Sequence, residues 1–145
     1  MDIDDILYIC IKLDDKSKTE LKCLVNEMFA DDYAKLFCDH LTLAFGREVE
    51  LFDLDLIGEK VKIVSGTVAF NEKIAALVVD RSQVEKYGVN NEHPHITLAT
   101  FDYITRPVHS NHMLSLRDEG YETVEFSNDP IELSGEIVAV PKSHF

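Results

Sequence analysis

Two stretches of the chain, HLTLA at residues 40–44 and HITLA at residues 95–99, differ only at the second position, by Leu against Ile. Successive side chains of an extended chain point to opposite faces, so each stretch places its histidine and threonine on one face and the aliphatic residues at its second and fourth positions on the other. We predict that both stretches are strands whose aliphatic face is buried in a core. If a pseudo-twofold axis relates the two strands, two imidazoles and two hydroxyls meet in one cleft.

The side chains that would meet in this cleft suit acid–base chemistry at a phosphodiester. Histidine has an unperturbed pKa near neutral pH, so one imidazole can accept a proton while its protonated partner donates one. Hydroxyl groups can donate hydrogen bonds to the non-bridging phosphate oxygens, where negative charge accumulates. We therefore predict a metal-independent phosphodiesterase without cofactors, with His40 and His95 as its catalytic residues. Thr42 and Thr97 are expected to bind the phosphate, and the sequence leaves open which histidine is the base.

A helix is predicted after the first strand of the chain. Ser17 and Glu20 have the spacing of a capping box. An apolar stripe follows at helical intervals, made of Leu21, Leu24, Val25, Met28 and Phe29. This helix should cover one face of a sheet.

The remaining patterns predict an α+β fold. Strands are expected at residues 6–13, 35–45, 49–56, 60–70, 73–80, 94–101 and 131–140, and short helices at 82–88 and 110–119. A hairpin is expected around Asn71-Glu72, with bulges at Gly66 and Gly135. Because the elements show no regular β-α-β alternation, antiparallel sheets are favoured over a doubly wound parallel sheet.

Length and charge limit the possible partners. A chain of 145 residues corresponds to one domain, here with two small lobes sharing a core. The 27 acidic residues outnumber the 14 basic ones, for a net charge of −13. Long nucleic acids and anionic membranes attract basic surfaces, so neither is an expected partner. A small nucleotide, held by a local potential in a pocket, remains compatible, and we expect a monomer.

The chain is expected to be intracellular and cytoplasmic, which includes a host cytoplasm if the source is a virus. Its N-terminus is acidic rather than basic, which argues against a signal peptide, and no apolar run is long enough to cross a bilayer. The three cysteines, Cys10, Cys23 and Cys38, are odd in number and far apart. That pattern is typical of reduced thiols rather than of a disulfide framework.

Further residues are candidate substrate contacts. If the less apolar face of the first strand lines the cleft, Tyr8 could stack on a base and Lys12 could offset phosphate charge; otherwise they form an ordinary strand surface. His93 is a candidate because it lies close to His95 in the chain. Three final candidates follow the second motif.

The segment after the second motif contributes the candidates Tyr103, Ser110 and Asn111 as base or ribose contacts, although helix capping explains Ser110 equally well. A rival interpretation assigns His93 and His95, together with His109 and His112, to a metal site. No cysteine or carboxylate is placed convincingly with these histidines, so no metal site is predicted.

At HLTL (residues 40–43) and HITL (residues 95–98) the sequence resembles the 2H phosphoesterase superfamily, whose members carry two His-x-Thr/Ser motifs. The resemblance spans nearly the whole chain. It implies a bilobal α+β fold with two antiparallel sheets around a central cleft and helices outside. It also implies catalytic roles for His40 and His95 and phosphate-binding roles for Thr42 and Thr97.

The resemblance leaves the substrate open. The superfamily includes RNA 2′,3′-cyclic phosphodiesterases, domains of tRNA ligases, LigT-like enzymes, and viral enzymes that degrade 2′-5′ oligoadenylates or cyclic oligonucleotide messengers. LigT-like proteins usually carry an arginine two residues after the motif's Leu, where this chain has Thr100. The departure argues against the LigT subgroup and its RNA preferences. A non-catalytic nucleotide sensor of the same fold is the main alternative, although both histidines and both threonines are retained.

Overall fold

The computed structural model describes residues 3–30, 32–88, 93–107, 109–115, 120–126 and 128–142, without the side chains of residues 109, 111 and 112. Its strands are β1 (Ile6–Leu13), β2 (Lys35–Leu36), β3 (His40–Phe45), β4 (Lys60–Ser65), β5 (Thr67–Phe70), β6 (Ile74–Val78), β7 (His95–Thr100), β8 (Glu122–Glu125) and β9 (Ile131–Pro141). Its helices are α1 (Asp15–Phe29), α2 (His109–Leu114) and the 3-10 turns η1 (Ile3–Asp5), η2 (Gly46–Leu51), η3 (Leu54–Leu56), η4 (Arg81–Gln83) and η5 (Glu85–Tyr87).

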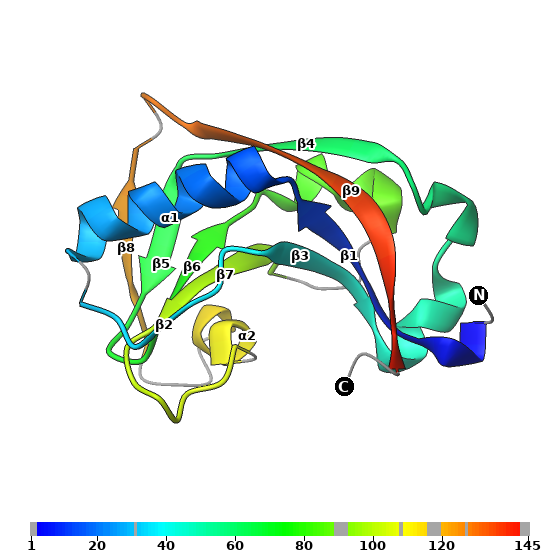
Figure 1. Ribbon diagram of the computed structural model, residues 1–145, viewed down its shortest axis with the longest axis horizontal. Coiled ribbons are helices and arrows are strands. Elements are labelled where there is room, and N and C mark those ends of the chain that lie inside the picture. Colours follow the sequence, from blue (N-terminus) through cyan, green and yellow to red (C-terminus); the bar gives the residue numbers. More distant parts are fainter. Residues whose placement is uncertain are drawn as a thin grey trace.

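The strands of the described residues form one curled antiparallel sheet in the order β4-β9-β1-β3-β7-β6-β5-β8, with β2 also paired to β7. The sheet bends into an arch, with β3 and β7 near its crown (Figure 1). The predicted mixed α and β content with antiparallel pairing is confirmed. The expected division into two sheets is not, because the ladder continues across the centre through the pair Leu41 and Ile96.

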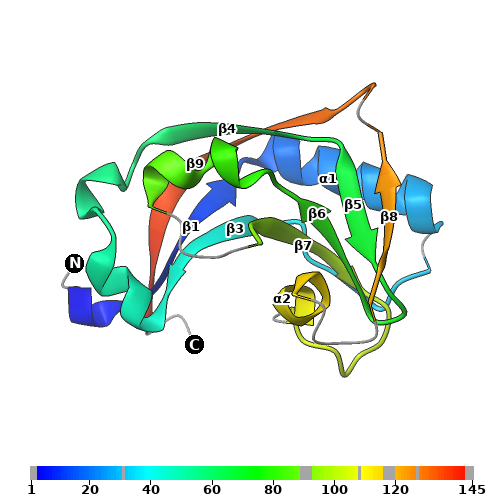
Figure 2. The same ribbon diagram turned by 180° about the vertical axis from the view of Figure 1, so that it is seen from behind.

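The helices lie on opposite faces of this arch. Helix α1 crosses its outer side, and α2 lies beneath β6 and β7 on the inner side (Figures 1 and 2). Val84, between η4 and η5, belongs to the same buried cluster as Leu21 and Val25 of α1. On the inner side, Met113 and Leu114 of α2 pack in a smaller cluster with β5 and β6. No helix of the described residues is both long and apolar enough to span a membrane.

Helix α1 has the predicted apolar stripe and a different start. Leu21 and Val25 are completely buried, which stabilises the fold by roughly 1.5–3 kcal/mol for each side chain. The N-cap is Asp14, whose carboxylate accepts a hydrogen bond of 2.8 Å from the Ser17 amide. The Ser17 hydroxyl, predicted to cap the helix, instead accepts from the amide of Ser134 at 2.8 Å. That contact ties α1 to β9.

The prediction of a strand at residues 49–56 is wrong, because η2 and η3 occupy this segment. Val49 and Phe52, three residues apart, are both buried, whereas Leu51 between them is 82% exposed. A spacing of three suits a 3-10 turn, in which residues three apart share a face. The apparent alternation of apolar residues in this segment therefore came from a helical repeat.

The predicted hairpin at residues 60–80 is confirmed only in its second half. Strands β5 and β6 pair across the turn at Asn71, but β4 leaves them at Gly66 and pairs with β9. Gly135 of β9 is not a bulge, since it pairs in register with both Leu13 and Val61. A Cβ atom at Gly135 would lie 2.6 Å from the carbonyl oxygen of Lys12, so close strand packing requires glycine there. The short, exposed edge strand β8 was not predicted.

Candidate active site

The two motif stretches form the neighbouring strands β3 and β7. Their backbones meet at Leu41 and Ile96, the second position of each motif, so a local twofold relates one motif to the other. Over the first five positions the burial pattern is the same in both strands. In each, the histidine and threonine are partly buried and the aliphatic residues are fully buried. The predicted division into a polar face and a core face is confirmed.

Matching bulges reinforce the symmetry of these strands. In β3, Thr42 and Ala44 pair with consecutive residues of β1, which leaves Leu43 as the extra residue. In β7, Thr97 and Ala99 pair with consecutive residues of β6, which leaves Leu98 as the extra residue. A bulge interrupts the alternation of side chains, so the leucine and the following alanine are both buried in each strand.

The chain has a second bulge where it enters β3, at Asp39 and His40. The amide of Cys38 donates to the Thr97 carbonyl, whereas Leu41 already pairs with Ile96. The chain therefore advances three residues, from Cys38 to Leu41, while β7 advances one, from Thr97 to Ile96. Asp39 and His40 are the two extra residues on this side of the pairing. Cys38 makes the turn with a φ of +52°, a left-handed conformation that costs of order 1 kcal/mol or more in a residue other than glycine.

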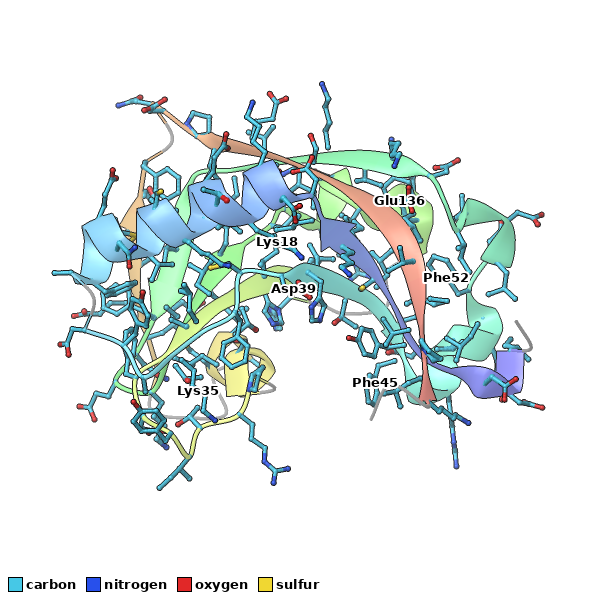
Figure 3. All side chains as sticks on the ribbon, in the orientation of Figure 1. Lys18, Lys35, Asp39, Phe45, Phe52 and Glu136 are labelled. Carbon is cyan, nitrogen blue, oxygen red and sulfur yellow. The ribbon has the colours of Figure 1, made fainter. Side chains whose placement is uncertain are left out.

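The His40 ring is held by a carboxylate. Its Nδ1 lies 3.1 Å from Oδ2 of Asp39, and Oδ1 of Asp39 lies 3.0 Å from Nζ of Lys18. Figure 3 shows Asp39 near the middle of the arch, close to Lys18 at the start of α1. Burial raises the pKa of Asp39, but the hydrogen bonds from Lys18 and His40 outweigh it and hold that pKa below its ordinary value. Because a carboxylate only accepts, Nδ1 donates and Nε2 is the free nitrogen of the ring.

The His95 ring is held by a backbone carbonyl instead. Its Nδ1 lies 2.8 Å from the carbonyl oxygen of His93, so Nδ1 again carries a proton. Burial lowers the pKa of His95; the His93 hydrogen bond opposes this shift, and the nearby His40 reinforces it. His95 is therefore neutral at pH 7, with an unprotonated Nε2 that can accept a proton.

The two threonines also differ in their partners. The Thr97 hydroxyl shares a hydrogen bond of 3.0 Å with the hydroxyl of Ser110, a completely buried residue of α2. The Thr42 hydroxyl has no hydrogen-bond partner among the described residues. Ser110, predicted as a substrate contact or a helix cap, therefore touches the second motif, and its burial suits a residue that orients Thr97.

The first strand brings both of its candidate residues to the His40 side. Lys12 pairs with His40 across β1 and β3, which places both side chains on one face. The Tyr8 ring stacks on His40, with 5.5 Å between centroids and 27° between planes. It also stacks on Phe45 at 6.1 Å. Phe45 is 55% exposed and extends this aromatic row outward.

Other predicted residues lie elsewhere or outside the described part. Tyr103 is 75% exposed on the loop after Thr100, beyond the end of β7 opposite to His95. The side chain of Asn111 is outside the described residues, as are those of His109 and His112 in the rival metal site. His93 contacts His95 through its backbone carbonyl group, which lies within hydrogen-bond distance of the His95 ring. No cluster of three or more potential metal ligands exists among the described side chains.

Sequence reasoning missed Asp39, Lys18 and Phe45. One signal was present, because an acidic residue directly precedes the first motif whereas Pro94 precedes the second. Lys18 is 21 positions from Asp39 in the chain, and no sequence pattern links the two.

The described side chains include groups of the kind that general acid–base chemistry needs. His95 has a free, unprotonated Nε2, and His40 has a carboxylate that provides a counter-charge to a protonated ring. The hydroxyls of Thr42 and Thr97 lie on the same faces of their strands as the two rings. This arrangement suits general acid–base catalysis at a group with developing negative charge.

A comparison with protein families supports this chemistry. The family described as "Fungal tRNA ligase phosphodiesterase domain" matches residues 31–140, a range that contains both motif strands. No curated protein gave a match.

Proposed function

The chain belongs to the family of fungal tRNA ligase phosphodiesterase domains, within the 2H phosphoesterase superfamily, and from this premise we propose that it opens 2′,3′-cyclic phosphates on short RNA fragments. A phosphodiesterase of the 2H type is the enzyme class that this family implies. The observation that carries the finer proposal is the adjacency of β3 and β7, which places a histidine and a threonine of each motif about one local twofold.

The base in this proposal is His95. Its neutral ring accepts a proton from water at Nε2, and the oxygen of that water forms a bond to phosphorus. Support comes from the lowered pKa of His95 and from the His93 carbonyl, which holds the proton on Nδ1. A base of this kind accelerates a reaction by roughly 10²- to 10⁴-fold.

The acid is His40, in its protonated form. It donates the Nε2 proton to the ribose oxygen as the bond from that oxygen to phosphorus breaks, so the products are a phosphomonoester and a free ribose hydroxyl. Asp39 accepts from Nδ1 and keeps the ring oriented, while Lys18 holds Asp39. The Thr42 and Thr97 hydroxyls donate to the non-bridging oxygens, with Thr97 oriented by Ser110.

Charge supports a short substrate. The net charge of −13 opposes a long polyanion, whereas Lys12 beside His40 offers local compensation for one phosphate. Tyr8 and Phe45 offer ring faces for a base. We extend the proposal to a monomeric enzyme with no membrane or long nucleic-acid partner.

A cytoplasmic location is part of the same proposal. Cys10, Cys23 and Cys38 are all free thiols, and burial raises the pKa of Cys10 and Cys38 to about 12. Buried thiols with raised pKa values react slowly, which suits cysteines kept as small apolar residues in a reducing compartment.

The decisive experiment is a substrate panel with the product linkage identified. It contains a 2′,3′-cyclic mononucleotide, a dinucleotide ending in a 2′,3′-cyclic phosphate, a cyclic dinucleotide and a 2′-5′ oligoadenylate, each with and without EDTA. We expect turnover of the 2′,3′-cyclic phosphates, undiminished by EDTA. Turnover restricted to the cyclic dinucleotide or the 2′-5′ linkage would assign a messenger-degrading function. Tight binding with all ligands left intact would show a nucleotide sensor, and loss of activity in EDTA would overturn the metal-independent mechanism.

A further inference from the structure

A hollow of about 250 Å³ lies on the inner side of the sheet, next to the second motif. Its polar lining residues are Thr67, Arg81, His93, Tyr121 and Thr123, and we call it the Arg81 pocket. Val78 and Leu114 form an apolar part of its wall. None of the catalytic or phosphate-binding residues proposed above lines it.

The Arg81 pocket begins one strand away from the proposed base. Val78, which lines it, is the cross-strand partner of His95 on the neighbouring strand β6. Adjacent strands are about 5 Å apart, and directly paired residues share a face. His93 also lines the pocket, and its carbonyl is the group that orients His95. A ligand that reaches the proposed base is therefore adjacent to the pocket.

The lining residues provide the groups that bind a nucleotide. The Arg81 guanidinium has no ion-pair partner in the part of the chain that the structure describes, and guanidinium groups bind phosphate in a bidentate manner. Thr67 and Thr123 add hydroxyl groups on neighbouring strands. The Tyr121 ring is 38% exposed and can stack on a base.

Size and charge limit the ligand to one nucleotide unit. Pockets for small ligands span about 300–1,000 Å³, so this hollow is slightly smaller than that range. Glu125, which pairs with Thr67, is exposed on the same edge of the sheet. A single arginine can hold one phosphate but does not form a track for a long strand.

We propose that the Arg81 pocket binds the penultimate nucleotide, the one on the 5′ side of the nucleotide that carries the cyclic phosphate. Arg81 contacts the phosphate of this penultimate nucleotide, and Tyr121 lies against its base. The inference rests on the proposed function and narrows it. The preferred substrate is then an oligonucleotide of at least two residues ending in a 2′,3′-cyclic phosphate, and a cyclic mononucleotide leaves the pocket empty.

The test compares two substrates, a 2′,3′-cyclic mononucleotide and a dinucleotide with the same terminal group, in the full chain. Arg81→Gln should lower kcat/KM for the dinucleotide by about 10- to 100-fold, the value of a charge-assisted hydrogen bond, and leave the mononucleotide unchanged. Tyr121→Ala should lower kcat/KM for the dinucleotide alone by roughly 5- to 100-fold, the value of one stacked base. Lys22→Gln, which removes the same charge from an exposed position on α1, is the matched control and should affect neither substrate.

Equal losses on both substrates, or no loss on either, would overturn the Arg81 pocket as a nucleotide site. Thermal melting of each variant separates these outcomes from unfolding. If the wild-type chain opens neither substrate, the proposed function fails, and binding of a non-cleavable dinucleotide 3′-phosphate still decides the inference. Weaker binding by Arg81→Gln than by Lys22→Gln would support the pocket, and equal binding would exclude it.

Discussion

Strands β3 and β7 carry almost the same five residues and the same bulge, yet they present their histidines in different surroundings. His40 is the second residue of a two-residue bulge and contacts a carboxylate that is itself held by Lys18. His95 follows Pro94 and contacts a backbone carbonyl, and partial burial lowers its pKa. The repeat thus supplies two equivalent side chains, and their neighbours make them chemically unequal.

The chemical character of the two equal motifs therefore depends on the residues around them. A neutral buried imidazole suits proton acceptance, and an imidazole next to a carboxylate suits proton donation. Four predictions test this contrast.

The largest effects are expected from the histidines themselves. His40→Ala and His95→Ala should each lower kcat for a 2′,3′-cyclic phosphate by about 10²- to 10⁴-fold, because each removes one proton-transfer group. A 4-nitrophenyl phosphodiester needs no protonation of its leaving group. With that substrate His40→Ala should recover most of its activity and His95→Ala should not, as measured by nitrophenolate release.

His144→Ala, a histidine substitution outside both motifs, is the control for these variants. Recovery by His95→Ala instead of His40→Ala would reverse the acid and base assignments. Near-normal rates in both variants with the natural substrate would disprove the two-histidine mechanism.

A smaller effect is expected from the carboxylate that distinguishes the first motif. Asp39→Asn should lower kcat by about 10- to 100-fold with little change in KM, because a neutral amide replaces the charged acceptor that orients the His40 ring. Lys18→Gln should cost less than about tenfold, since it acts through a partly exposed ion pair.

A substrate whose leaving group needs no protonation tests the role of Asp39. The loss of activity in Asp39→Asn should largely disappear with the 4-nitrophenyl ester if Asp39 acts through the proposed acid, His40. Glu27→Gln, which removes the same charge from an exposed position on α1, is the control for the change in charge. An equal loss of activity with both substrates would show a structural role for Asp39.

The pH dependence of kcat/KM and of stability should reflect the pKa of His95 in the second motif. Burial lowers the pKa of His95 below its ordinary value of 6.5, so the acid limb of kcat/KM should have its midpoint below pH 6.5. The unfolded chain then binds the extra proton more readily than the folded chain. Stability should be full above about pH 6.5 and should fall as the pH drops toward the folded pKa of His95.

Urea unfolding of His95→Asn measures the stability part of this prediction. The variant should show a flatter pH dependence than the wild type in that window. An acid limb centred above pH 6.5, or an unchanged slope in the variant, would contradict the assignment of a neutral, buried His95.

The smallest effect concerns the sixth position of each motif strand, which is exposed Phe45 in β3 and completely buried Thr100 in β7. The Thr100 hydroxyl has no hydrogen-bond partner among the described residues. Thr100→Val should therefore raise the free energy of unfolding by about 1 kcal/mol, as a buried unsatisfied group is removed. Thr123→Val, at an exposed strand position, should change it by less than about 0.5 kcal/mol. A destabilised Thr100→Val variant would show that the hydroxyl is satisfied.

Much of the local structure was predictable because it follows from short-range patterns. The faces of residues 40–44 and 95–99 and the apolar stripe of α1 all depend on side-chain periodicity within one element. The prediction failed where periodicity was ambiguous, as at Val49 and Phe52, whose spacing fits a 3-10 turn. It also failed where pairing is non-local, as for β4, which joins β9 instead of the hairpin.

The order of residues along each motif is enough to put its histidine and threonine on one face of the strand, because alternation is a property of the extended chain. The differences between the two motifs come from tertiary contacts. Lys18 reaches Asp39 from α1, and Ser110 reaches Thr97 from α2. These contacts join residues from separate elements, and burial and hydrogen bonding at such contacts set the protonation and orientation of each group.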